Sequence, residues 1–362
     1  MTDRGKNDLD AGGAVARAAP RISFSTFLTR YYAIIFLVAL IIVSAIISDI
    51  FFTSRNIYTI LRQQTAYLII GMGMMMIIIT GGIDLSACSI AAVSSILTAY
   101  SMLHWGLSDG GLSTWVAIAI GVGTGAAFGA VNGLLIAGLK MPAFIVTLAM
   151  MYAGEGIAYL ITEGNTVMIS SQSAGYNDLV NFAMGKTVFD FPYLAILALI
   201  IILIFFFVMR YTTFGRMVYA VGSNETAVKL AGINSRLYQF FVYLLAGTLC
   251  GVAGVIICSR SGNASPLTAR HDYHMATIAG VVIGGASLAG GEGSVGMTVV
   301  GIFVMALISN ILSLRGMPTY PQLVVKAAVI IFAVLMPQII STVVKMWWLM
   351  WNKLKEILGG ND

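Results

Sequence analysis

The sequence predicts an all-helical protein that crosses a membrane many times. Of its 362 residues, 59% are hydrophobic and only 10% are charged, and the mean hydropathy is +0.91. A soluble domain carries about 25% charged residues. Since a helix needs about 20 mostly apolar residues to span a bilayer, apolar runs of that kind are the expected elements.

About ten apolar runs qualify, and we take them in order along the chain. They cover residues 31–48, 66–80, 88–103, 113–139, 143–162, 191–209, 237–258, 275–289, 294–313 and 323–341.

The two ends of the chain differ from the transmembrane region 31–341. Residues 1–30 mix charged residues with Ala and Gly and predict a disordered cytoplasmic tail. The first run is too long to be a removable signal peptide, so we expect it to remain as a span. Residues 342–362 interleave tryptophans with lysines, which is typical of a segment at the inner membrane interface.

The distribution of Lys and Arg predicts that both termini are cytoplasmic. With ten spans and the N-terminus inside, thirteen of these residues fall in inner segments and six in outer segments. This bias accounts for the net charge of +5, so the charge does not indicate nucleic-acid binding.

Two glycine-rich sequences interrupt the pattern. The run 66–80 is short for a span and is followed by Gly81 and Gly82, and the run 275–289 contains Gly284 and Gly285. Short or broken spans in both halves of a transporter indicate its substrate pathway, whereas ordinary glycine-rich turns are the alternative. Within 81–86 we expect Asp84 to order the break by accepting backbone amides at a helix start, in preference to binding substrate.

Two further repeats involve glycine and asparagine. Gly121, Gly125, Gly129 and Gly133 recur every four residues and predict a helix face that another helix approaches closely. The sequence 132–142 is similar to 310–318, each beginning with Asn, and the predicted topology makes these copies antiparallel. In the same topology the two glycine breaks lie on the same side of the membrane. The pair of glycine breaks and the pair of Asn sequences therefore cannot both belong to one simple inverted repeat. For the intramembrane amide of Asn132, hydrogen bonding between helices is favoured over ligand contact.

Few ionisable residues lie inside the runs. Glu155 and Lys326 both fall in the outer half of the bilayer, and we expect them to approach each other or to share a polar cavity. The alternative for Lys326 is that its side chain extends to the outer interface. Gln63, Gln64 and Tyr273 are further candidates for side chains that face a substrate.

The longest cytoplasmic connection, 210–236, contains a short predicted helix at 224–231 with Asn at its start and Gly232 after its end. A helix this short is marginal alone, so docking to a partner through Ala227, Leu230 and Ala231 would stabilise it. The alternative is an exposed linker.

Catalytic and metal-binding roles are not indicated. The three cysteines lie within or at the ends of apolar runs, and the three histidines form no HExxH pattern, so we expect no disulfide, metal site or catalytic set. An ion-coupled secondary transporter is a rival interpretation. The scarcity of buried carboxylates and the partner-like loop count against it.

At this point several motifs carry a resemblance that covers residues from about 30 to 340. They read FTSRN (52–56), GGIDLS (81–86), NGLL (132–135), PAFIVTL (142–148), FGR (214–216), GSNE (222–225), AGIN (231–234) and VVIGGASL (281–288). Together they resemble the ribose-type permeases of ABC importers.

The resemblance implies a fold like that of type II importers, in the bacterial inner membrane, without cofactor or catalysis on this chain. Two permease copies would pair with ATP-binding subunits, and a periplasmic protein would deliver a pentose or hexose. A polyol or a sugar-like signal molecule is the alternative cargo. The family's coupling helix would fall on 224–231, and the expected coupling residues are Gly222, Asn224, Glu225, Ala227, Leu230 and Gly232.

The chain departs from the family pattern at Cys88, Glu155, His274 and Ala276, where the family has Gly, Arg, Glu and Asp. The mechanism therefore transfers more safely than the substrate. The expected pathway residues are Gly81, Gly82, Asp84, Ser86, Asn132, Glu155, Tyr273, His274, Asn310 and Lys326.

Overall fold

The computed structural model describes residues 24–188, 190–270 and 273–332, with single positions between 335 and 350. The chain divides into two compact units, one of Met1–Tyr31 with Pro337–Asp362 and one of Tyr32–Met336. Most of the predicted tails 1–30 and 342–362 lies outside the described residues. The first helix begins at Phe24, earlier than the predicted span at 31. The fold below is that of the second unit.

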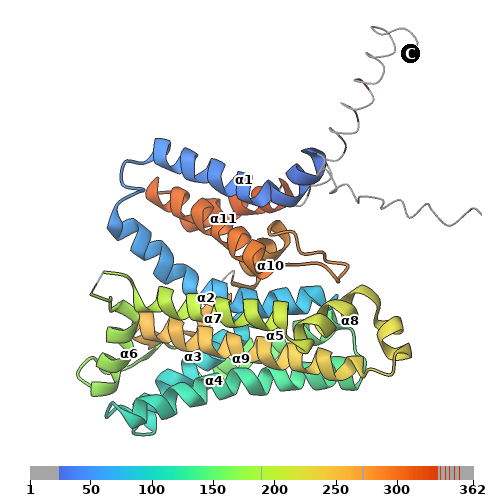
Figure 1. Cartoon of the computed structure of the whole chain (residues 1–362). Coiled ribbons are helices and arrows are strands. Elements are labelled where there is room, and N and C mark those ends of the chain that lie inside the picture. Colours follow the sequence, from blue (N-terminus) through green and yellow to red (C-terminus); the bar gives the residue numbers. More distant parts are fainter. Residues whose placement is uncertain are drawn as a thin grey trace, which may run out of the picture. The chain divides into compact units, whose positions relative to one another are not determined.

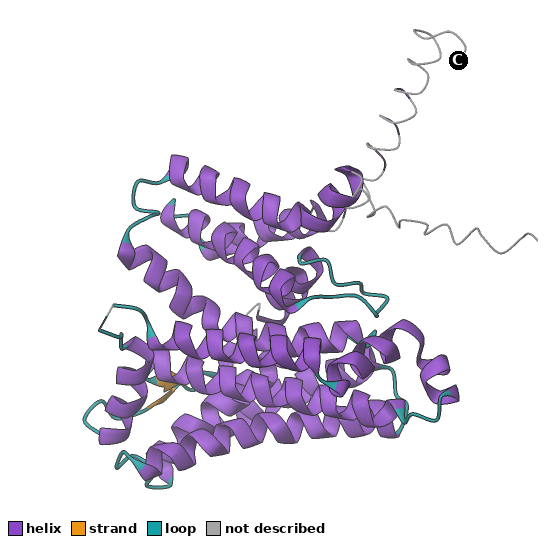
Figure 2. Ribbon diagram, viewed as in Figure 1, coloured by secondary structure: helices purple, strands orange, loops and turns teal. Residues whose placement is uncertain are grey.

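Helices make up almost all of the described chain (Figure 2). They are α1 Phe24–Ile47, α2 Ser54–Ile79, α3 Ala87–His104, α4 Leu112–Gly133, α5 Ala143–Thr162, α6 Ala174–Met184, α7 Tyr193–Tyr211, α8 Thr213–Leu230, α9 Ser235–Ser261, α10 Tyr273–Ile283 and α11 Val295–Leu314. A helical segment at Thr319–Phe332 follows. The short strands β1 (Val167–Met168) and β2 (Asn263–Ala264) pair antiparallel.

The helix ends follow the local turn chemistry. The Thr53 side chain accepts a hydrogen bond from the backbone N–H of Asn56 at the start of α2. At the start of α9, the Asn234 side chain accepts one from the backbone N–H of Arg236. α9 is followed by Gly262, whose φ of 65° lies in the left-handed region that glycine adopts without strain.

Helix α2 is the centre of the bundle. In Figure 1, α3–α9 lie together, α1, α10 and α11 form a second group, and α2 crosses between them. α2 packs against α7 and α9 of the first group and against α10 and α11 of the second. Its second half supplies most of the largest fully buried side chains, from Ile69 to Ile79. A displacement of α2 would therefore affect both groups.

The glycine face of α4 packs where the sequence predicts a close helix contact. α4 and α9 form the most extensive helix pair among the described elements. A methyl group on Gly125 would overlap the backbone of Gly247 and Gly251, whereas one on Gly123 would meet open space. The small residues thus let two backbones touch, as expected for helices in lipid.

Six described helical segments are long and apolar enough to cross a membrane. They are Ala87–His104, Leu112–Gly138, Ala143–Thr162, Tyr193–Tyr211, Ser235–Ser261 and Val295–Leu314. The expectation of about ten such helices is therefore supported only for six. Tyr31–Ile47 and Thr319–Phe332 are shorter apolar helices, and α10 has 11 residues.

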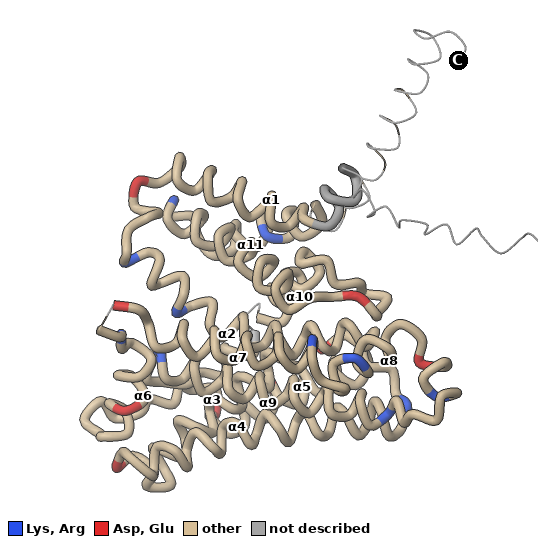
Figure 3. Tube along the Cα trace, viewed as in Figure 1, with Lys and Arg blue, Asp and Glu red and all other residues tan. Residues whose placement is uncertain are grey.

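The expectation that the second span is short is wrong. α2 has 26 residues and begins at Ser54, well before the apolar run at 66. Its first turns carry Arg and Gln, so an apolar-run criterion misses them although the helix is continuous. Charged residues elsewhere lie mainly near helix ends and in connections (Figure 3).

Candidate functional site

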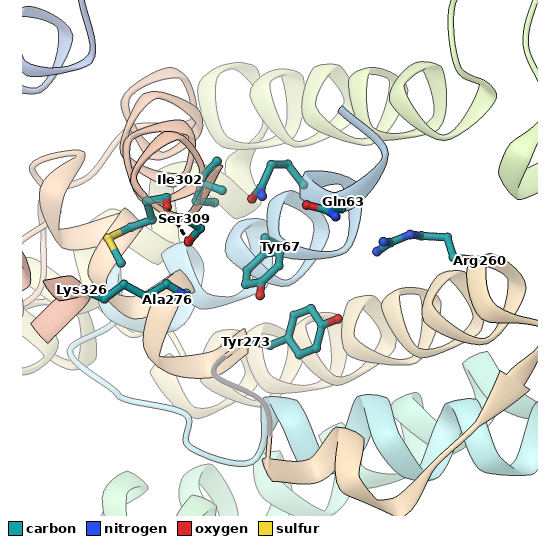
Figure 4. A pocket seen from close by; sticks show the side chains of 11 residues that line it. Gln63, Tyr67, Arg260, Tyr273, Ala276, Ile302, Ser309 and Lys326 are labelled. Atoms are coloured by element: carbon teal, nitrogen blue, oxygen red, sulfur yellow. Dashed lines mark hydrogen bonds between the residues drawn. The ribbon is translucent and has the colours of Figure 1, made fainter. Parts of the chain in front are cut away.

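A polar cavity of about 230 Å³ lies among α2, the end of α9, α10, α11 and the segment Thr319–Phe332. Its volume is below the roughly 300–1,000 Å³ of drug-sized ligand sites, so it suits a small metabolite. Figure 4 shows its side chains converging from these separate segments. The lining residues are Gln63, Gln64, Tyr67, Arg260, Tyr273, Ala276, Ile302, Met305, Ala306, Ser309 and Lys326.

Two tyrosines form the centre of this cavity (Figure 4). The rings of Tyr67 and Tyr273 have centroids 4.5 Å apart and are tilted by 36°. Tyr67 projects from α2, and Tyr273 is the first residue of α10. Tyrosine offers an apolar ring face together with a polar hydroxyl, a combination that suits a ligand with both kinds of surface.

Hydrogen-bonding groups complete the lining. Gln63, Gln64 and Tyr67 follow one face of α2 because residues three and four apart are neighbours on a helix. Within the described chain, the side chains of Gln63, Gln64 and Arg260 make no hydrogen bond or ion pair with another residue. The Ser309 hydroxyl donates instead to the carbonyl oxygen of Met305, 3.1 Å away.

The cavity brings together some of the expected pathway residues. Tyr273 and Lys326 line it, as do Gln63 and Gln64. Glu155 is not among the lining residues, so its expected meeting with Lys326 stays a prediction. Ala276 lines the cavity at a position where the resemblance would place Asp.

Sequence reasoning missed several lining residues. Arg260 follows the apolar run of α9 directly, and a lone cation at the end of a span is a signal that could have found it. Tyr67 lies one helical turn beyond Gln63 and Gln64. The apolar residues of α11 carry no signal that separates them from an ordinary core.

His274 does not line this cavity but contacts another position at which the chain departs from the family. Its Nδ1 atom lies 3.0 Å from Sγ of Cys88, and its backbone N–H also faces this sulfur at 3.4 Å. Cys88 is fully buried at the start of α3. The two departures therefore lie against each other, beside the residue that begins α10.

A second group of expected pathway residues forms a buried polar chain at the break 81–86. Oδ1 of Asp84 accepts hydrogen bonds from the backbone N–H of Ser86 at 2.7 Å and from its hydroxyl at 2.5 Å. The Ser86 hydroxyl accepts one from Nδ2 of Asn132 at 3.0 Å. All three residues are buried. Asp84 thus orders the start of α3, and Asn132 bonds to another helix, as the sequence predicts.

The two asparagines of the repeated sequence play matching parts. Asn132, near the end of α4, bonds to Ser86 at the start of α3. Asn310, near the end of α11, exchanges two hydrogen bonds with Asn56 at the start of α2, at 2.8 and 3.2 Å. Each asparagine thus bonds to the start of another helix, and an inverted repeat of these two sequences stays a prediction. Asn310 is not among the described residues that line the cavity.

The first glycine break meets the end of the loop that follows the second break, at what we call the glycine junction, formed by Gly81, Gly222, Gly290 and Gly291. The backbone N–H of Gly291 donates to the carbonyl oxygen of Ile79 at 2.8 Å. A methyl group on Gly222 would overlap that same oxygen and would lie 2.7 Å from the Gly291 nitrogen. Close backbone contacts thus join the end of α2, helix α8 and the loop between α10 and α11. The Tyr219 hydroxyl of α8 adds a hydrogen bond to the carbonyl oxygen of Gly293 in that loop, at 2.9 Å.

Helix α8 is interrupted directly after the junction. Asn224 has non-helical angles (φ −159°, ψ 90°), and its Oδ1 accepts from the N–H of Ala227 at 2.9 Å. At the other end, Gly232 N–H donates to Lys229 and Ile233 N–H donates to Val228, which together form a Schellman motif. The expected short helix, N-capped by Asn224 and ended by Gly232, is confirmed.

This capped helix presents the expected apolar face to its surroundings. Ala227 and Ala231 are exposed, and Leu230 has 85% of its surface exposed. Glu225 links this helix to the start of α9. Its Oε1 accepts hydrogen bonds from Lys229 Nζ at 2.8 Å and from the Ser235 hydroxyl at 2.9 Å. The Lys229 ammonium, with the Ser235 hydroxyl, lowers the pKa of Glu225 below its ordinary value.

A larger cavity of about 520 Å³ lies among α4, α6, α7 and α9. Apart from Asp178 and two hydroxyl residues, its lining consists of apolar side chains and a glycine, such as Trp115, Val252 and Ile256. The smaller cavity is the better candidate for a polar ligand because it gathers amides, hydroxyls and cations.

Comparison with known proteins places the chain among permeases. Residues 56–334 match the family described as branched-chain amino acid transport system / permease component. The chain is 36% identical over 306 residues to the ribose import permease protein of Escherichia coli (strain K12), covering 83% of this chain and 91% of that protein.

Two other relatives extend this likeness. The ribose import permease protein of Bacillus subtilis (strain 168) is 37% identical over 317 residues, covering 87% of this chain and 95% of that protein. The D-allose transport system permease protein of Escherichia coli (strain K12) is 34% identical over 322 residues, covering 88% and 94%. No solved structure matches the chain.

Proposed function

The chain belongs to the permease family described above, in its ribose-type branch of sugar ABC permeases, and we propose that it carries a monosaccharide across the inner membrane through the cavity around Tyr67 and Tyr273. It is a multi-pass inner-membrane protein. The observation that carries the proposal is the match to sugar permeases along more than 80% of the chain. A small cavity with tyrosine rings and amide side chains supports it.

We propose that the cavity faces the periplasm and the glycine junction faces the cytoplasm. Gln64 and Ile79 are 15 positions apart on α2, which is about 22 Å along a helix and most of the roughly 30 Å hydrocarbon core. The excess of Lys and Arg in the segments on the junction side supports cytoplasmic termini. In this arrangement α1, α2, α10 and Thr319–Phe332 complete ten crossings.

The partners follow from the same orientation. A cytoplasmic ATP-binding subunit docks on Ala227, Leu230 and Ala231, and a second permease copy completes the importer. A periplasmic binding protein delivers the sugar to the cavity side. Caps at both ends of the 225–230 helix support this assignment, because they hold an exposed apolar face in a fixed shape without a large core.

In this proposal, a displacement passes from the docking helix to the cavity through the contacts described above. ATP binding in the partner moves the docked helix, and the glycine junction transfers this displacement to α2 and to the loop between α10 and α11. α2 lines the cavity further along through Gln64, and α10, which leads into that loop, lines it through Tyr273. Gly81, Gly82, Asp84, Ser86 and Asn132 lie at the inner end of the pathway in this proposal. The buried Asn132 Oδ1 and Tyr243 hydroxyl, which have no partner in the described chain, give that end spare polar groups.

The test is reconstitution of this chain with its ATP-binding subunit and binding protein in proteoliposomes. We expect ATP-dependent uptake of a labelled monosaccharide that stops when the binding protein is left out. Uptake by this chain alone, driven by a sodium or proton gradient without ATP, would instead establish the secondary transporter.

A further inference from the structure

The cavity described above has an unusual balance of hydrogen-bonding groups. Among its described lining residues are two cations, Arg260 and Lys326, and no carboxylate. Arg and Lys side chains only donate hydrogen bonds, and the side-chain acceptors available here are amide and hydroxyl oxygens. The described part of the lining therefore offers a ligand more hydrogen-bond donors than acceptors, and the Arg260 guanidinium adds a positive charge.

Arg260 is the more informative of the two cations. It lies in the last turn of α9, which ends at Ser261. No other residue of the described chain forms an ion pair or hydrogen bond with its guanidinium. In Figure 4 this side chain extends into the cavity toward Tyr67 and Gln63. A planar guanidinium carries five donors in a fork that matches a carboxylate or a phosphate.

The arrangement of the other groups fits the rest of a sugar. Figure 4 places Arg260 and Lys326 on opposite sides, with Tyr67 and Tyr273 between them. A ring held against the tyrosines would have one edge near Arg260 and hydroxyl groups within reach of Gln63 and Gln64. Charge-assisted bonds are about twice as strong as neutral ones, so the anionic edge would fix the orientation of the ring.

We propose that the transported monosaccharide carries an anionic group, a carboxylate or a phosphate, and that Arg260 binds this group. The inference rests on the proposed function and names the chemical class of its substrate. It predicts discrimination against neutral sugars of the same ring, because a neutral sugar leaves the guanidinium fork without its matching acceptor.

The experiment compares three labelled sugars with one ring: D-glucose, D-glucuronate and D-glucose 6-phosphate. Uptake is measured in proteoliposomes that contain the complete importer. We expect at least one acidic sugar to be taken up at least tenfold faster than glucose, and the two acids distinguish carboxylate from phosphate. The variant Arg260→Gln should lower the uptake of that acid at least tenfold, while Arg260→Lys should restore part of it.

Arg55→Gln is the matched control, since Arg55 is an exposed cation in the first turn of α2 and does not line the cavity. Its uptake should equal that of the unaltered chain. If Arg260→Gln does not fold, the three-sugar comparison still decides. Glucose uptake equal to or above that of both acids would overturn the inference and leave the proposed function standing. ATP-independent uptake would overturn both. If none of the three is taken up while the same importer transports a neutral pentose such as D-ribose, the inference is overturned and the proposed function stands.

Discussion

The middle and the last turn of α2 are built in opposite ways. Near the middle of the helix, Gln63, Gln64 and Tyr67 present polar side chains to a cavity. At the last turn, the backbone of Ile79 lies against Gly222 and Gly291, and there is no room for a side chain on Gly222. A site made of side chains can change its ligand by substitution. The joint cannot accept even one methyl group at Gly222, so α2 separates recognition near its middle from force transmission at its last turn.

The largest expected effect comes from Gly222→Ala at the glycine junction. The added methyl group would overlap the carbonyl oxygen of Ile79. We expect the free energy of unfolding to fall by about 1–3 kcal/mol and ATP-dependent uptake to be lost. Thermal unfolding in detergent and proteoliposome uptake measure the two effects. Gly296→Ala in α11, where a methyl group meets open space, is the control. Equal stability and uptake for both variants would contradict a backbone-built joint.

Next in size is Leu230→Glu on the docking helix. The side chain is 85% exposed in the isolated chain, so the change should leave its stability unaltered. A charge placed in an apolar interface should reduce uptake and recovery of the ATP-binding subunit by tenfold or more. Thr213→Glu adds the same charge at an exposed position in the first turn of α8, where the helix dipole tolerates it. If both variants copurify equally with the ATPase, the docking face lies elsewhere.

A smaller effect is expected from Gln64→Ala in the cavity lining. Loss of one neutral hydrogen bond to substrate should raise the half-saturating sugar concentration by about three- to tenfold, without changing the maximal rate or the stability. Ser309→Ala serves for comparison, because that hydroxyl already bonds to its own helix. A drop in maximal rate alone for Gln64→Ala would show that the cavity lining also transmits force.

The smallest expected effect concerns pH at the docking helix. Since pairing with Lys229 and Ser235 lowers the pKa of Glu225, its stabilising effect is present above the ordinary value of 4.5 and is lost as the pH falls through the lowered value. The pair is substantially exposed, so the effect should be about 0.3–0.5 kcal/mol. Difference titration of the unfolding temperature against Glu225→Gln measures it. A loss on the alkaline side of neutrality would contradict the assignment.

Sequence patterns revealed what is local and missed what is assembled from distant segments. The cap at Asn224, the end at Gly232 and the glycine face of α4 follow from short-range chemistry, and all were predictable. The first half of α2 was missed because its polar residues, including Gln63 and Gln64, resemble a loop when only apolar runs are counted. Those residues are polar because they line a cavity.

The cavity itself could not be derived from the sequence. Its walls come from five segments, from Gln63 to Lys326, and no spacing rule relates residues so far apart. The pairing of Asn56 with Asn310 spans 254 positions and is equally hidden. The repeated sequences indicated a correspondence between α4 and α11 but not which helix each amide would contact.

The capped helix at 225–230 has a practical meaning for engineering. Its start is fixed by Asn224 and its end by Gly232 and Ile233, so its shape is encoded within ten consecutive residues. Such a cassette could be exchanged between permeases to redirect one transporter to the motor subunit of another. The natural boundary for the exchange lies just after Gly222, because that glycine belongs to the glycine junction and not to the docking helix.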